Sequence, residues 1–211
     1  MNHAYISSFS APVSTKKTKQ SSTIKPPCQA IDFVTKDIYG KTIDLERYSG
    51  KGVLLCFFRN TDRPLRNHRL LELTRKYKEW KKIGVEVIVV FNENSAVLRK
   101  RFESKPRPFP VIADPNLYLY QKYGVQRIIG KDIVTPTVPS PTWVKKIFRG
   151  PLERFKPNGR IMPADFLINT QGKIIGAWYG KSETDHMPND RLETFAIATR
   201  IAIRKRELNY K

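Results

Sequence analysis

The residues of this sequence best suited to chemistry are its two cysteines and two of its histidines. Cys28 lies in the basic segment KPPCQ, and Cys56 lies inside the apolar run LLCFF. The thiolate is the reactive form of cysteine, so a reactive thiol needs a nearby positive charge or a helix N-terminus. Cys28 has Lys25 nearby but no helix to position it, and a cysteine in a buried strand behaves as a small hydrophobic residue. We therefore keep a redox role for Cys28 or Cys56 as an alternative interpretation.

The histidines do not complete a catalytic or metal site. His68 falls on the first turns of a basic helix, which favours a solvated or partner-facing side chain. His186 follows Asp185 in TDHMPND, but no nucleophile is evident that would make the pair part of a triad. Two cysteines cannot form the usual four-ligand zinc site, and no ligand spacing indicates another metal. The sequence predicts no metal and no cofactor.

The charge of the chain predicts an acidic partner. Its 211 residues include 39 Lys and Arg against 19 Asp and Glu, a formal net charge of +20. Nucleic acid, an anionic membrane surface and an acidic protein assembly all fit such a balance. No apolar segment approaches the roughly 20 residues of a membrane-spanning helix. With so few cysteines, we expect an intracellular compartment, the cytoplasm or a plastid stroma, and a position peripheral to a membrane complex stays open.

The first half of the predicted domain, 31–205, alternates strands and helices. The stretch AIDFVTKDIYGKTIDLERYSGK predicts a hairpin that turns at Gly40. GVLLCFFRN and VEVIVVFNEN are continuous apolar runs, typical of central strands that are buried on both faces. Between these strands we expect a helix with Pro64 in its first turn and Gly84 at its end. A short helix capped by Ser95 follows.

The second half of the domain continues this order. FPVIADPN predicts a strand, LYLYQKYGV a helical turn, and ADFLINTQGKIIGAWYG a hairpin about a Gln-Gly turn. The last helix is expected from about Asn189 to Arg206. Strands that alternate with helices predict an α/β fold with a central mixed sheet and helices on both faces.

Three basic segments stand outside this pattern. Residues 1–30 contain no acidic residue and read as an extended arm, with a transit peptide as the alternative. The segment 126–160 is rich in proline and in Lys and Arg, and it reads as a long insertion in which Trp143 is an aromatic anchor. Residues 206–211 are expected to form a basic C-terminal tail.

The order of these elements resembles the thioredoxin fold as the peroxiredoxin-like (AhpC/TSA-type) proteins elaborate it. The resemblance covers roughly Ile31 to Ala202. Three local matches carry it. The stretch LERYSGKGVLLCFFRN resembles the lead-in strand of the family, and RPLRNHRLLEL stands where the family has its redox motif and helix. The stretch MPADFLINTQGKI, followed by GKSETDHMPNDRL, resembles the closing hairpin and the approach to the last helix.

Within this resemblance, arginines stand at the helix mouth, the loop between GVLLCFFRN and the helix that follows it. Arg63 falls on the attacking cysteine, Arg66 on the second cysteine, and Pro64 on the proline of the motif. Arg59 falls on an arginine often seen after the aromatic pair, and Pro163 on a cis-proline that faces the active site. Peroxide reduction requires a thiolate, and arginine is a permanent cation, so the resemblance implies that the chain is not an enzyme.

A basic surface remains as the predicted working part. The apolar stripe of the helix behind the helix mouth should face the sheet, which turns its charges outward. The predicted partner-binding residues are Lys16, Lys17, Lys19, Lys25, Arg63, Arg66, Arg69, Arg75, Lys76, Trp143, Lys145, Lys146, Arg204, Lys205 and Arg206.

These residues favour a redox-inactive structural or linker subunit that docks into a large acidic assembly. An acidic protein complex such as a phycobiliprotein antenna is preferred over an RNA-containing complex, because no RNA-binding motif is evident. Contact with a membrane surface is not excluded by the sequence. Two alternatives are a thiol-dependent peroxidase or oxidoreductase that uses Cys28 or Cys56, and a regulator that binds an anion through Arg63 and Arg66 at the helix mouth.

Overall fold

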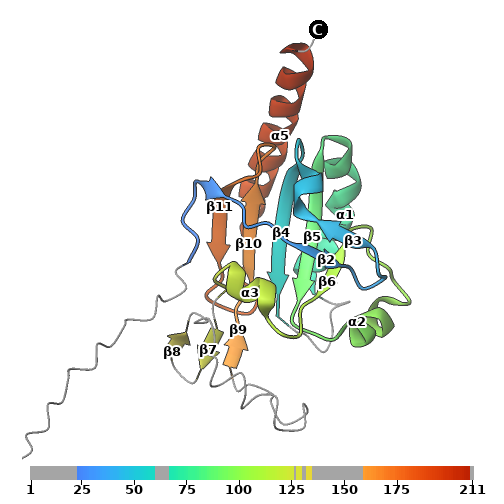
Figure 1. The fold of residues 1–211 in the computed structure, drawn as a ribbon, viewed down its shortest axis with the longest axis vertical. Helices are drawn as coiled ribbons and strands as arrows, with labels where there is room; N and C mark the ends of the chain where they lie inside the picture. The colour runs from blue at the N-terminus through green and yellow to red at the C-terminus, as the bar shows by residue number, and fades with distance from the viewer. Residues whose placement is uncertain (1–22, 60–66, 126, 130–131, 135–158, 210–211) are drawn as a thin grey trace, which may run out of the picture.

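The structure is a computed structural model, and it describes residues 23–59, 67–125, 127–129, 132–134 and 159–209 (Figure 1). Within these residues, a six-stranded mixed sheet runs in the order β1-β11-β10-β4-β5-β6. Strand β4 is parallel to β5 and antiparallel to β10, and β5 is parallel to β6. The bounds of these strands are β1 (Cys28–Gln29), β4 (Gly52–Phe58), β5 (Val85–Phe91), β6 (Val111–Ala113), β10 (Ala164–Ile168) and β11 (Lys173–Tyr179).

Two smaller sheets and the helices complete the described fold. The hairpin β2–β3 is antiparallel, and a three-stranded sheet has the order β8-β7-β9. The bounds of these elements are β2 (Val34–Lys36), β3 (Thr42–Asp44), β7 (Arg127–Ile129), β8 (Asp132–Val134), β9 (Gly159–Ile161), the 3-10 helix η1 (Leu45–Tyr48), and the helices α1 (His68–Lys82), α2 (Ser95–Phe102), α3 (Tyr118–Lys122) and α5 (Asn189–Asn209).

The central sheet is covered on both faces, as the apolar runs predicted. Every residue of β4 and β5 is buried. Alternate residues of β4 enter two separate cores: Leu54, Cys56 and Phe58 pack with α1, α2 and α5, whereas the intervening residues pack with η1, α3 and the β2–β3 hairpin. The predicted α/β architecture with a mixed central sheet is therefore confirmed.

Two predicted turn glycines adopt backbone conformations that favour glycine. Gly40 turns the β2–β3 hairpin with a φ of 88°, and Gly84 follows α1 with a φ of 83°. Both angles lie in the left-handed region, where a Cβ is unfavourable. At Gly84 the space is also occupied, since an added Cβ would lie 2.2 Å from Cδ1 of Ile203. The C-terminal part of α5 is thus seated against the end of α1.

Two of the predicted helix starts need correction, whereas the start of the last helix at Asn189 is confirmed. Helix α1 begins at His68, and the side chain of Asn67 accepts a hydrogen bond from the backbone N–H of Leu70 at 3.0 Å. The first turn of α1 therefore begins later than the predicted start. Helix α2 is capped by Asn94 rather than by Ser95, because the Asn94 side chain accepts from the N–H of Ala96. The amide oxygen of asparagine can accept a capping hydrogen bond as well as the hydroxyl of serine can. The sequence alone therefore did not decide between Asn94 and Ser95.

The predicted segment boundaries also shift. Strand β1 joins the central sheet by pairing with β11, so the domain begins before residue 31. Helix α5 continues to Asn209, so residues 206–209 are helical rather than a tail. The interval 126–160, predicted as an irregular insertion, contains β7, β8 and the start of β9. Across the described residues, no helix has the length and apolar character that crossing a membrane requires.

Candidate functional site

The helix mouth lies where β4 ends and α1 begins. Arg63, Pro64 and Arg66 fall in the segment 60–66, outside the described residues, so their predicted placement stays a prediction. The structure does describe the walls on either side: the end of β4, the first turn of α1, the start of β10 and the loop before α5.

Arg59 and Pro163, the two other positions taken from the resemblance, lie on these walls. Arg59 follows β4 and makes an ion pair with Glu183 in the loop before α5. Pro163 is buried, and its carbonyl accepts a hydrogen bond from the N–H of Gly180 at 2.8 Å. The expected cis bond before Pro163 is wrong, because the only cis peptide in the described chain joins Pro26 to Pro27.

A buried polar cluster, consisting of Arg69, Asp165 and His186, lies behind the helix mouth. Asp165 is in β10 and is completely buried. His186 Nδ1 lies 3.1 Å from Asp165 Oδ2, and the backbone N–H of Met187 donates to the same oxygen at 2.7 Å. Arg69 Nη2 lies 3.6 Å from Oδ2, a distance suited to an ion pair but too long for a hydrogen bond. The helix start, the strand and the loop before α5 thus meet at one carboxylate.

The neighbours of Asp165 keep it ionised. Burial by itself would raise the pKa of this carboxyl group. The charge and hydrogen bond of His186, together with the charge of Arg69, outweigh burial, and the pKa of Asp165 is lowered. A buried carboxylate with such partners is costly to leave unpaired, so this cluster ties together the elements that surround the helix mouth.

Cys56 faces this cluster and is poorly suited to redox chemistry. It is fully buried and is paired across the sheet with Asp165. Burial, followed by the negative charge of Asp165, raises the pKa of Cys56 well above its ordinary value, and Arg69 offsets only part of that effect. The thiol therefore stays protonated, and a protonated thiol is a weak nucleophile.

Cys28 lies on β1, at the edge of the sheet, and is half-buried. Strands β11 and β10 lie between β1 and β4, so Cys28 is about 14 Å from β4 at the usual strand spacing. A disulfide requires Cα atoms within about 7 Å. Cys28 and Cys56 cannot form one in this fold.

Arg69 corrects the predicted outward basic surface. Only 7% of its side chain is exposed, whereas it was expected to face a partner. Arg69 precedes Leu73 by one helical turn, which places it on the stripe that faces the sheet. There it donates to Asn189 Oδ1 at 2.9 Å and lies 3.4 Å from Glu72, so its charge is used inside the molecule.

The remaining predicted partner-binding residues divide into three groups. Lys76 is half-buried and is paired with Glu193 of α5 at 2.5 Å, so it also holds elements of the fold together. The second group is outside the described residues: Lys16, Lys17, Lys19, Trp143, Lys145 and Lys146. The third group is exposed: Lys25, Arg75, Arg204, Lys205 and Arg206.

Asp165 is the member of the site that sequence reasoning missed. The signal was present, since ADFLI has a single acid within an apolar strand. A charge at such a position requires a buried partner, which directs attention to the nearby arginine and histidine. Within the described ranges, no group of three or more His, Cys, Asp or Glu side chains is arranged to hold a metal ion.

Comparisons with known proteins place this geometry in a family. The chain is 32% identical over 99 residues to the thiol-disulfide oxidoreductase ResA of Halalkalibacterium halodurans, covering 46% of this chain and 56% of that protein. It is 32% identical over 95 residues to the chloroplastic peroxiredoxin Q of Triticum aestivum, covering 44% and 43%. The chain thus spans about half the length of these curated relatives.

The fold is shared with a solved peroxiredoxin structure. The structure of AhpC from Enterococcus faecalis superposes with a TM-score of 0.59 at 15% sequence identity, covering 83% of this chain and 93% of that one. This likeness confirms the thioredoxin-like fold with its central mixed sheet. The model of the AhpC/TSA family matches residues 26–177, and the chain therefore belongs to the AhpC/TSA family.

Proposed function

We propose that this member of the AhpC/TSA family is a redox-inactive structural subunit that docks through basic surfaces into an acidic protein assembly. The proposal has two parts: the absence of thiol catalysis, and docking through exposed positive charge. Each rests on a different observation and is tested separately.

The placement of the two cysteines supports the first part. The sequence contains no other cysteine, so a thiol at the helix mouth would have to come from Cys28 or Cys56. Cys56 is sealed in the central sheet with a raised pKa, and Cys28 lies at the sheet edge. Peroxide reduction by a thiolate needs an accessible, acidified cysteine. Cys56 meets neither requirement, and Cys28 is separated from β4 by two strands of the sheet.

The C-terminal half of α5 is the observation that carries the second part. The buried residues of this helix end at Thr199, and the helix continues past the body of the domain (Figure 1). Arg204, Lys205 and Arg206 are exposed on this half, although Ile203 still packs beside Gly84 and the guanidinium of Arg206 lies beside Gly50. Self-repulsion between such charges favours a state in which an acidic partner neutralises them.

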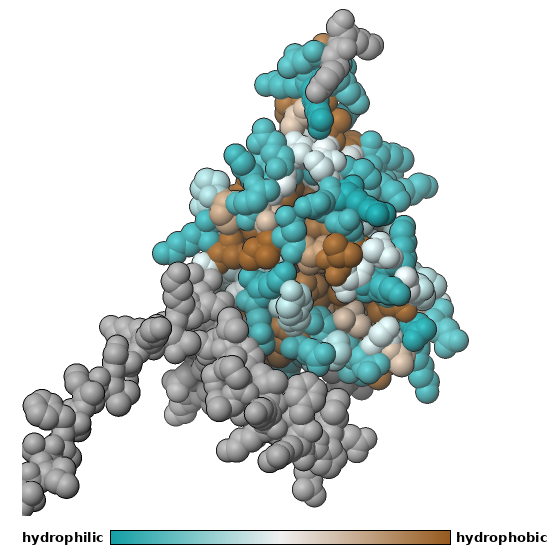
Figure 2. Space-filling model, viewed as in Figure 1, coloured by the Kyte–Doolittle hydropathy of each residue, from teal (hydrophilic) through white to brown (hydrophobic). Residues whose placement is uncertain are grey.

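The same half of α5 favours a protein as the partner. Ile201 and Leu208 are 50% and 65% exposed, and Figure 2 shows hydrophobic surface beside hydrophilic surface on the projecting helix. Burial of apolar side chains against a partner lowers the free energy of the complex, whereas phosphate backbones bind chiefly through charge. A helix that offers both fits the groove of an acidic protein better than it fits RNA.

The docking part is tested by recovering the tagged chain from its own cells. We expect acidic proteins to copurify and to stay bound after nuclease treatment. The variant Arg204→Glu/Lys205→Glu/Arg206→Glu should lose them.

The matched control for docking is Lys36→Glu/Lys100→Glu/Lys105→Glu, which changes the net charge equally at exposed positions elsewhere. Partners released by nuclease would contradict a protein assembly. Equal losses in both triple variants would contradict docking through α5.

The inactivity part is tested by a peroxidase assay with a dithiol reductant. The wild type and the Cys28→Ser/Cys56→Ser variant should consume peroxide at the same background rate. The competing function, a thiol-dependent oxidoreductase, is favoured by the names of the relatives, ResA and peroxiredoxin Q. That function predicts turnover by the wild type which disappears in the double variant.

A further inference from the structure

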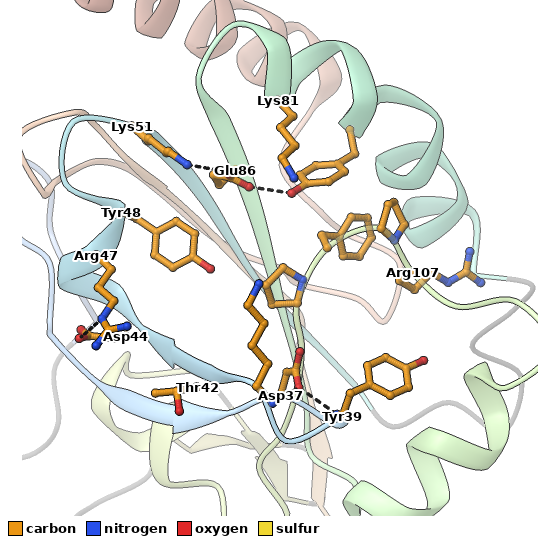
Figure 3. A pocket seen from close by; sticks show the side chains of 15 residues that line it. Asp37, Tyr39, Thr42, Asp44, Arg47, Tyr48, Lys51, Lys81, Glu86 and Arg107 are labelled. Carbon is orange, nitrogen blue, oxygen red and sulfur yellow. Dashed lines mark hydrogen bonds and ion pairs between the residues drawn. The ribbon is translucent and has the colours of Figure 1, made fainter.

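A pocket of about 510 Å³ lies at the opposite end of the sheet from the buried polar cluster. The residues that line it come from the β2–β3 hairpin, η1, the last turns of α1, the start of β5 and the loop 107–110 (Figure 3). Pockets that bind small molecules typically measure about 300–1,000 Å³. We call this the basic pocket, and the residues that matter here are Lys41, Tyr48, Lys51, Tyr77, Lys81 and Glu86.

The acidic groups in the walls of the basic pocket are already engaged. Glu86 accepts from Lys51 Nζ at 2.8 Å and from the hydroxyl of Tyr77 at 2.6 Å. Asp44 pairs with Arg47 at 3.3 Å. Asp37 accepts two backbone N–H groups of its own hairpin, each at 2.9 Å. Glu86 and Asp44 are thus paired with cations, whereas Asp37 is held by neutral N–H groups.

Two lysines of the pocket lack a close salt-bridge partner, although the charge of Lys81 acts on Glu86 and helps to lower the pKa of that carboxyl group. Lys41 and Lys81 are exposed and make no ion pair with any residue in the described part of the chain. The ammonium of Lys81 lies 5.6 Å from the ring centroid of Tyr77, near the Glu86 site. Arg107 does not add to them, because its guanidinium points away from the opening in Figure 3 and lies 3.3 Å from Thr74 Oγ1. Exposed ammonium groups beside a concave wall attract anions.

Aromatic side chains provide the rest of the surface. Tyr39 is 54% exposed at the rim, and Phe109 is buried beneath. The hydroxyl of Tyr48 points into the opening (Figure 3). Burial, then the charges of Glu86 and Asp37, raise the pKa of Tyr48, so its hydroxyl stays protonated and can donate a hydrogen bond. Flat aromatic ligands stack on such rings.

We propose that the basic pocket binds a nucleoside diphosphate, with the phosphates held by Lys41 and Lys81 and the base against Tyr48. Lysine binds phosphate as a point charge, and the ring of Tyr48 supplies the flat surface that a nucleobase requires. This site lies away from the helix mouth and from α5. It goes beyond the proposed function and does not depend on it.

Calorimetric titration of the full chain with ADP tests the proposal. We expect saturable binding of one ADP per chain. Adenosine and pyrophosphate should each bind at least about tenfold more weakly, because each carries only half of the recognised chemistry. Lys41→Gln/Lys81→Gln should weaken ADP binding by at least about tenfold, which corresponds to loss of one good charged contact.

The matched control is Lys173→Gln/Lys181→Gln, which removes the same charge from exposed lysines outside the pocket. This control should bind ADP within about twofold of the wild type. All four lysines are exposed, and thermal melting would verify that each variant folds. No heat of binding up to about 1 mM ADP, or equal weakening in both double variants, would overturn the site. Pyrophosphate that binds as tightly as ADP would overturn the role of the aromatic wall.

Discussion

The buried polar cluster and the basic pocket lie at opposite ends of the same strands, and they use charge in opposite ways. At the carboxyl ends of β4 and β5, Arg69 and Asp165 are buried and lie 3.6 Å apart as an ion pair. At the amino ends, Glu86 is neutralised by its neighbours, whereas Lys41 and Lys81 are left open to solvent.

Ligands of open α/β sheets usually bind at the carboxyl ends of the strands. The segment of this chain that falls on the redox motif of the family follows β4 at that end. In this chain, the described side chains at that end are committed to holding the fold together. Exposed Lys and Arg side chains that are not paired inside the fold are found at the amino ends of the strands and along α5. The comparison teaches that a cationic side chain is available to a partner only where it is exposed and is not already paired inside the fold.

The largest expected effect is in the buried polar cluster. Asp165→Asn removes the buried carboxylate that pairs with both Arg69 and His186, and it leaves Arg69 with Glu72 as its remaining carboxylate partner. We expect the free energy of unfolding to fall by about 3–5 kcal/mol. Urea denaturation measures this loss. Glu103→Gln, an exposed acid on the domain surface, is the matched control and should change stability by less than about 0.5 kcal/mol. A loss below about 1 kcal/mol for Asp165→Asn would mean that the cluster is not structurally important.

A fall in pH should lower the free energy of unfolding of the wild type more than that of Asp165→Asn. The pKa values of Asp165 and Glu86 are both lowered in the folded state. The stability that these groups provide is present above their unfolded pKa values of about 4, and it is lost as pH falls through the folded values. Urea midpoints at about pH 7 and about pH 3 should therefore differ less in Asp165→Asn than in the wild type. Identical differences would contradict the assigned pKa direction.

An intermediate effect is expected at Glu86 in the basic pocket. Glu86→Gln keeps the shape of the side chain but weakens its bonds to Lys51 and Tyr77, and we expect a loss of about 1–3 kcal/mol. The loss should be smaller than at Asp165, because Lys51 is 48% exposed and returns to water when its partner is lost. Urea denaturation of both variants side by side checks the order. A reversed order would reverse the comparison between the two regions.

The smallest effect is expected at the open lysines. Lys81→Gln should change the free energy of unfolding by less than about 0.5 kcal/mol, because Lys81 is exposed and solvent screens its attraction to Glu86 and to the ring of Tyr77. Thermal melting measures this change. A large loss would show that Lys81 is structural and would remove the distinction between an engaged and an available charge.

The sequence predicted the layers of this domain well, because they depend on local patterns. The apolar runs of β4 and β5 and the turns at Gly40 and Gly84 all fall where expected. The starts of α1 and α2 were less well predicted, because Asn67 and Asn94 compete with nearby residues for the capping role. Such competition depends on where the chain enters the helix, which no local pattern records.

The candidate sites were harder to predict, because they depend on contacts between distant segments. Arg69 looked like one more exposed cation of a basic helix until Asp165, almost a hundred residues later, was placed beside it. The basic pocket likewise joins residues of the hairpin, α1 and β5. Its lysines do not stand out in the sequence. Only the structure shows that Lys51 and Tyr77 donate to Glu86, whereas Lys41 and Lys81 stay exposed.

The outermost strands of the central sheet bear on how the protein behaves when it is crowded. One edge is β1, with two residues, and the other is β6, with three. The β6 edge is partly closed by a bridge between Ile112 and Asp37. Long unpaired edges are templates on which further chains add strands and aggregate. These short strands offer little such template themselves, but within the described residues β1 pairs only with Lys173 and Ile174 of β11. The outer edge of residues 175–179 is therefore where copies held at high local concentration would add a strand.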